Sequence, residues 1–135
     1  GTTSQIVARV TGKEIKTSLT YYNPSIPPTA EMDGIDLVTE GVLTMSRAVE
    51  YAKKYTESMG DIDNVVTLNK EDGASKLARL LLIDCTSVNF FTGRAINPAH
   101  QNPGFPVNLG IKLRLVDEMV QCLTQMGKQV TVEYY

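Results

Sequence analysis

The feature that most constrains the fold of this chain is a repeated change in the spacing of its apolar residues. Segments whose apolar side chains recur with the helical period alternate along the chain with segments whose apolar side chains recur at every second position, the strand period. Strands separated by helices predict right-handed crossover connections between parallel strands. We therefore expect an α/β protein, a three-layer Rossmann-like sandwich with a mostly parallel sheet of about four strands.

Helices are predicted where an apolar stripe of helical period lies next to a residue that commonly begins or ends a helix. Thr2 or Thr3 suits the N-cap of the first helix, and Asp72 suits the N-cap of the third. Three of the apolar stripes are followed by a glycine, which is typical of the C-terminal end of a helix. The apolar stripes that mark the predicted helices span residues 6–10, 42–59, 77–81 and 116–126, with stops at Gly12, Gly60 and Gly127.

Strands are predicted where apolar and polar residues alternate, or where β-branched and aromatic residues cluster. They lie at residues 13–21, 35–38, 87–91 and 130–134, and Val65 and Val66 indicate a further short extended segment. Prolines and glycines make residues 22–34 and 93–106 loops. Asp33 and Asp36 are too few ligands for a magnesium or calcium site, so Asp33 and Gly34 are interpreted as a turn leading into a strand.

The composition excludes several classes of function. The chain has 135 residues, of which 42% are hydrophobic and 21% charged, as expected of one folded domain. A formal net charge of −2 argues against a nucleic-acid partner, and no apolar run is long enough to span a membrane. The sequence shows no signal peptide, and Cys85 and Cys122 have the character of cytosolic thiols, so we expect a cytoplasmic protein. The single histidine, His100, leaves a multi-histidine metal site without ligands.

The start of the chain has an unusual organisation. It opens directly on a helix cap, whereas a Gly-Thr-Thr turn in a strand–helix unit normally follows a strand. The sequence contains no internal repeat and no low-complexity stretch. We therefore expect residues 1–135 to form a single domain taken from a longer polypeptide.

Three polar turns, at residues 1–3, 39–41 and 92–94, lie where strands are expected to end. We expect them to converge on one edge of the sheet and to form a ligand site there. In an open parallel sheet, ligands bind outside the carboxyl ends of the strands, where helix N-termini offer free N–H groups to phosphate or carboxylate. Arg94 would supply the counter-charge. The alternative is that Thr3 and Thr39 only cap helices. The residues predicted to bind the ligand are Thr2, Thr3, Thr39, Glu40, Gly41, Arg94, Asn97, His100 and Asn102.

The segment from Arg94 to Pro103 is the most unusual part of the sequence. Two Asn-Pro pairs impose extended or turn geometry around the only histidine. His100 could act as an acid–base group or bind a ligand, or it could satisfy the backbone of its own loop. No cysteine, serine or carboxylate motif stands beside it, so a catalytic role is not predicted.

Four stretches of the chain resemble one known family in the same order. They are Gly1-Thr-Thr-Ser-Gln-Ile-Val-Ala-Arg9, the segment from Pro27-Pro28 through Asp33-Gly-Ile-Asp-Leu-Val-Thr-Glu-Gly-Val-Leu-Thr44, Asp72-Gly-Ala-Ser-Lys-Leu-Ala78, and Gly93–Pro103 with its Asn-Pro-Ala-His-Gln-Asn-Pro motif. They resemble the C-terminal region of bacterial serine/threonine phosphatases of the stage II sporulation protein E type, which are relatives of the metal-dependent protein phosphatases. The resemblance extends to the last residues of the chain.

The resemblance implies that a phosphatase domain precedes this segment in the same polypeptide and is its partner. Two divalent metals are implied for that absent domain, and no cofactor is expected for this segment. The leading hypothesis is a non-catalytic accessory domain that senses a ligand, such as a phosphate-containing small molecule, or binds a partner. Two alternatives stay open: an enzyme domain acting on a phosphorylated small molecule at the strand ends, and a structural or dimerising domain with an exposed apolar patch.

Overall fold

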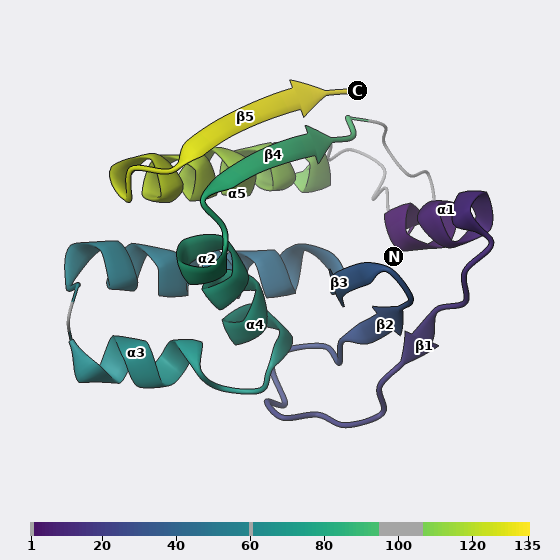
Figure 1. Ribbon diagram of the computed structural model, residues 1–135, viewed down its shortest axis with the longest axis horizontal. Helices are drawn as coiled ribbons and strands as arrows, with labels where there is room; N and C mark the ends of the chain where they lie inside the picture. The colour runs from purple at the N-terminus through teal and green to yellow at the C-terminus, as the bar shows by residue number, and fades with distance from the viewer. Residues whose placement is uncertain (1, 60, 95–106) are drawn as a thin grey trace.

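The computed structural model describes residues 2–59, 61–94 and 107–135 (Figure 1). Its elements in chain order are α1 (Thr2–Thr11), β1 (Lys16–Thr17), β2 (Ala30–Met32), β3 (Ile35–Val38), α2 (Gly41–Glu57), α3 (Ile62–Leu68), α4 (Gly73–Arg79), the π-helical turn η1 (Leu80–Asp84), β4 (Ser87–Thr92), α5 (Val107–Gln125) and β5 (Gln129–Tyr134). They are layered: β5 of the β4–β5 pair packs on α5, α5 packs on α2, and α2 packs on α3 and α4.

The α/β class is confirmed, but the sheet differs from the single, mostly parallel sheet of about four strands that the sequence predicts. The described residues form two small sheets, an antiparallel sheet in the order β1-β2-β3 and a parallel pair, β4 and β5. The physical reason lies at the turn between β2 and β3, where Gly34 has a φ of +83°. That tight turn returns the chain at once, so β3 runs antiparallel to β2 and joins it instead of β4.

Two strand predictions in the first part of the chain are wrong. Only Lys16 and Thr17 of the predicted strand 13–21 pair with another strand, and Leu19 is 93% exposed, because this alternating segment has no core to face. The predicted loop 22–34 contains β2, which pairs on one side with β1 and on the other with β3. The prolines precede β2, so they do not remove its hydrogen bonds.

Two helices also differ from the prediction. Val65 and Val66 lie in α3, which begins because the side chain of Asp61 accepts a hydrogen bond from the N–H of Asp63 at 3.0 Å. Helix α5 begins well before the predicted stretch 116–126. Ile111 and Leu115 continue the helical spacing toward its start and pack on the same core.

Helix ends are formed largely as the glycines predict. After α1, Gly12 adopts a φ of +70° and the N–H of Lys13 donates to the carbonyl of Ala8 at 3.0 Å. The same left-handed cap ends α5, where Gly127 has a φ of +80°. Helix α2 ends at Glu57, and the predicted stop at Gly60 lies outside the described residues.

Helix starts are predicted less well. Helix α1 already includes Thr2 and Thr3, so neither is the N-cap that the sequence predicts. The N-cap of α2 is Glu40 and not Thr39, and the Glu40 side chain makes no capping hydrogen bond. Asp72 is confirmed as the N-cap of α4.

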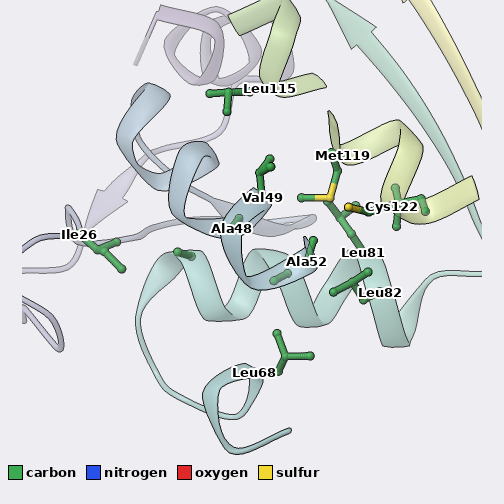
Figure 2. Close-up of a cluster of buried hydrophobic side chains, with 13 residues drawn as sticks. Ile26, Ala48, Val49, Ala52, Leu68, Leu81, Leu82, Leu115, Met119 and Cys122 are labelled. Carbon is green, nitrogen blue, oxygen red and sulfur yellow. The ribbon is translucent and has the colours of Figure 1, made fainter. Parts of the chain in front are cut away.

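One apolar core joins the helices (Figure 2). Alanines spaced four apart on α2 and on α4 let these two helices pack closely, and Met119 of α5 is fully buried beside them. The inward side chains of β4 and β5 cover the same cluster and are half-buried. The core residues are Ile26, Ala48, Val49, Ala52, Leu68, Ala74, Ala78, Leu81, Leu82, Leu115, Met119, Cys122 and Leu123.

The two cysteines should react at very different rates. Cys122 is buried in the core, and burial raises the pKa of its thiol, whereas Cys85 is only half-buried after η1. Because the thiolate is the reactive form, we expect a thiol reagent to label Cys85 in the folded protein and Cys122 only after unfolding. A titration with a chromogenic disulfide should release one equivalent in buffer and two in denaturant. Release of both equivalents at one rate in buffer would contradict this.

Candidate functional site at the carboxyl ends of β4 and β5

The two parallel strands end at the same edge of their sheet. Ser87–Thr92 pairs in register with Gln129–Tyr134, so Thr92 lies opposite Tyr134. The pairing continues beyond the strands: the N–H of Tyr135 donates to the carbonyl of Thr92 at 2.9 Å, and the N–H of Arg94 donates to the carbonyl of Tyr135 at 2.6 Å. The backbone at Gly93 and Arg94 is therefore held at the carboxyl end of the sheet, where ligands bind in parallel α/β proteins.

Two cationic side chains gather at this edge. The Nζ of Lys112, on α5, donates a hydrogen bond to the carbonyl of Gly93 at 2.9 Å. The guanidinium of Arg94 lies over the ring of Tyr134, 5.7 Å from its centroid. The Tyr134 hydroxyl in turn is 3.4 Å from a carboxylate oxygen of Asp117 on α5. We call Arg94 and Lys112 the cation pair of the site.

The cation pair keeps its charge available. Within the described ranges, neither Arg94 nor Lys112 forms an ion pair, and Arg94 is exposed. Lys112 uses one of its three N–H donors on Gly93, which leaves two for other acceptors. A guanidinium suits the paired oxygens of a phosphate or carboxylate, and an ammonium donates hydrogen bonds to the same groups.

The residues predicted near Thr39 are placed differently. The Thr39 methyl group lies 3.7 Å from the position that a side chain on Gly73 would occupy, so Thr39 packs against the start of α4. Gly41 has a φ of +74°, and the carbonyl of Glu40 accepts a hydrogen bond from Thr44 at 2.8 Å. This turn follows a strand of the antiparallel sheet, so the shared sheet edge on which the predicted convergence depends is not formed by the described residues.

Convergence of the three polar turns stays a prediction. Thr3 lies on α1 and is exposed, and Thr2 is the first residue of that helix. No hydrogen bond or ion pair within the described part of the chain joins α1, the Thr39 turn and Arg94 to one another. Asn97, His100 and Asn102 lie outside the described residues.

Lys112 is the site residue that sequence reasoning misses. In the sequence Lys112 is an isolated charge, as is Lys53, and nothing near either residue marks a site. In the structure Lys53 pairs with Glu118 at 3.0 Å between α2 and α5. The available signal is the topology: a helix that connects two parallel strands returns along them, so its first turns lie beside the end of the first strand. Applying this rule to Lys112 requires knowing that β4 pairs in parallel with β5, because that pairing brings the start of α5 to Gly93.

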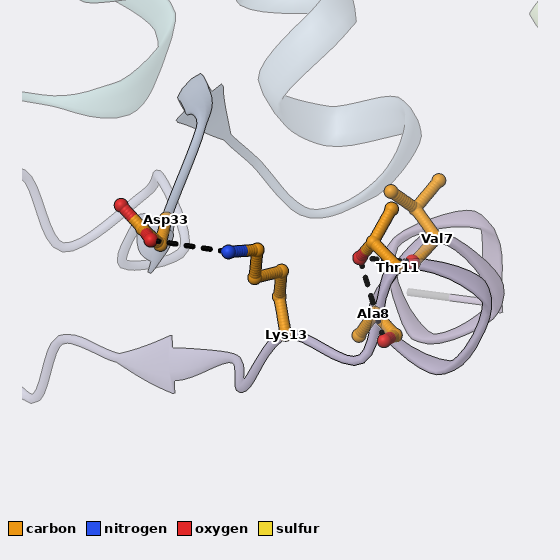
Figure 3. A network of polar contacts seen from close by, with 5 residues as sticks. All are labelled: Val7, Ala8, Thr11, Lys13 and Asp33. Atoms are coloured by element: carbon orange, nitrogen blue, oxygen red, sulfur yellow. Dashed lines mark hydrogen bonds and ion pairs between the residues drawn. The ribbon is translucent and has the colours of Figure 1, made fainter.

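Asp33 lies in the turn that the sequence predicts and is not part of the site. Its carboxylate pairs with the Nζ of Lys13 at 3.3 Å, which ties the segment after α1 to the β2–β3 turn (Figure 3). Both side chains are largely exposed, so the pair contributes little to stability.

The described residues lack two further features. They contain no cluster of three or more His, Cys, Asp or Glu side chains placed to hold a metal ion. None of the helices in the described ranges combines the length and apolarity needed to cross a membrane. Comparison of the chain with protein-family models, with curated proteins and with solved structures finds no match.

Proposed function

We propose that this chain is a non-catalytic accessory domain that binds a phosphate-bearing small molecule through the cation pair, Arg94 and Lys112. The observation that carries the proposal is the placement of two cations without ion pairs in the described part of the chain at the carboxyl edge of two parallel strands. A charge-assisted hydrogen bond to such an anion contributes about 1.5–3 kcal/mol. The ligand class follows from guanidinium and ammonium donors that converge on one edge.

The parent protein in this proposal is a cytoplasmic serine/threonine phosphatase of the stage II sporulation protein E type. The proposal is supported by the sequence resemblance, which includes the Asn-Pro-Ala-His-Gln-Asn-Pro motif that begins three residues after Arg94. It is also supported by the β4–α5–β5 unit, because a parallel strand–helix–strand unit is the element from which Rossmann-like sheets are built. The accessory domain would report the presence of its ligand to the attached phosphatase domain.

The test is a titration of the chain with inorganic phosphate, followed through the backbone amide resonances of Gly93 and Arg94. Arg94→Ala and Lys112→Ala are each expected to weaken binding by a factor of about 10 or more, since each removes a charge-assisted hydrogen bond. Arg114→Ala is the matched control, because Arg114 is an exposed cation on the same helix and should leave the affinity unchanged. Added salt should weaken binding to the wild-type chain.

Two results would count against this function. Equal phosphate affinity in the wild-type chain and in the Arg94→Ala/Lys112→Ala double variant would show that the cation pair does not bind phosphate. Manganese- or magnesium-dependent hydrolysis of a phosphoester by the isolated chain, retained on repurification, would favour the enzyme alternative. Because Arg94 is exposed, we expect Arg94→Ala to unfold at the wild-type temperature. Lys112→Ala also loses the hydrogen bond to Gly93, so its unfolding temperature is measured beside its affinity to separate a binding defect from a folding defect.

A further inference from the structure

The β4–β5 sheet has one covered face and one open face. The inward side chains of both strands pack on the core, whereas Phe91 is 70% exposed and Tyr135 is 67% exposed. Their rings lie 6.3 Å apart, and Glu133 is the register partner of Phe91. We call Phe91, Glu133 and Tyr135 the sheet patch. Parallel strands are ordinarily covered by helices on both faces, and no helix of the described residues covers this patch.

Helix α1 is amphipathic and carries apolar side chains that are exposed to solvent. None of its described side chains is buried, and Val10 is 77% exposed. Ile6, Arg9 and Val10 are spaced three and four apart, so they share one face of the helix. We call these three residues the helix patch.

The two patches complement each other: each has an apolar surface, and the two carry opposite charges. The sheet patch has two aromatic rings beside one carboxylate, and the helix patch has two aliphatic side chains beside one guanidinium. Helix α1 contains no acidic residue, so Arg9 meets no competing charge on its own helix. A helix that places its aliphatic residues on the rings brings Arg9 to Glu133.

We propose that two copies of this chain associate by docking the helix patch of one copy on the sheet patch of the other. A second copy is the occupant because α1 is held away from its own sheet. Helix α1 ends at Thr11, and Lys13 just after it pairs with Asp33 in the β2–β3 turn of the antiparallel sheet (Figure 3). Reciprocal docking around a two-fold axis covers both patches of both copies and closes the assembly as a dimer.

The test is the association constant of the full 135-residue chain by sedimentation equilibrium. Arg9→Glu and Glu133→Arg should each raise the dissociation constant about tenfold or more, because each places like charges together at the contact. The double variant should restore association, since it re-forms the pair with its signs exchanged. Restoration is the result that a purely structural effect of either single substitution cannot produce.

Apolar substitutions supply the matched control. Val10→Asp should abolish association, whereas Ile62→Asp should leave it unchanged, since Ile62 is 75% exposed on α3 and lies outside both patches. Circular dichroism and thermal unfolding of each variant check that the fold persists. A chain that stays monomeric at every concentration reached, or an Arg9→Glu/Glu133→Arg double variant no better than its parents, would overturn the proposal. Neither result would touch phosphate binding at Arg94.

Discussion

Met119→Ala is expected to lower the free energy of unfolding by about 2–5 kcal/mol, the range observed when a fully buried methionine or leucine is truncated to alanine. Met119 has no exposed surface and lies between α5 and α2, next to Val49 and Leu81 (Figure 2). Its removal leaves a cavity among packed helices, so the cost adds a cavity contribution to the lost burial of the side chain. Urea unfolding, followed by the helical circular-dichroism signal, measures the change in the free energy of unfolding.

Leu43→Ala is the control for this measurement. Leu43 lies on α2 and is largely exposed, so its truncation removes few contacts and should change stability by no more than about 0.5 kcal/mol. The comparison also tests whether α5 packs on α2, since Met119 of α5 belongs to the core that the two helices share. If Met119→Ala cost no more than Leu43→Ala, α5 would not pack on α2 as the structure describes.

The helices are the part of the fold that the sequence predicts best, because their determinants are local. The predicted helix 42–59 corresponds to Gly41–Glu57, and Gly12 and Gly127 form the left-handed caps that their positions predict. These features depend on residues within a few positions of one another. Errors arise where two weak local signals compete, as in α3, where paired valines favour a strand and the cap at Asp61 favours a helix.

The sheets are predicted poorly because strand pairing is set by contacts between distant residues. Strand β2 lies just beyond a proline-rich stretch that marks a loop, and its pairing with β3 depends on the positive φ of Gly34. Nothing local distinguishes β3, which joins the antiparallel sheet, from β4, which joins β5.

The candidate site shows the same division between local and distant information. Arg94 is predictable, since it follows a strand that ends in a polar turn. Lys112 is not, because its role depends on α5 returning along β4 to bring its Nζ to Gly93. Thr39 follows a strand as Arg94 does, but its strand belongs to the other sheet and its methyl group packs near Gly73.

A second large loss of stability is expected for Asp72→Ala, by about 2–4 kcal/mol. One carboxylate oxygen of Asp72 accepts the N–H of Ser75 at 2.9 Å, and the other accepts the Ser75 hydroxyl at 2.8 Å. Both residues are buried, so no water replaces the lost acceptors. The cost is the lost helix cap plus the desolvation of a buried N–H and a buried hydroxyl left without partners.

Asp61→Ala separates these two contributions, because Asp61 caps α3 through the same kind of bond to Asp63 but is exposed. Water can satisfy the freed N–H there, so we expect a loss of about 0.5–1 kcal/mol. In the Asp72→Ala/Ser75→Ala double variant the orphaned hydroxyl is also gone, so the combined loss should be smaller than the sum of the two single losses. Equal losses for Asp72→Ala and Asp61→Ala, or strict additivity in the double variant, would mean that burial adds nothing to the cap. The stability at the start of α4 would then come from backbone packing around Gly73 alone, where the Thr29 methyl group already lies 3.0 Å from the position of an added side chain.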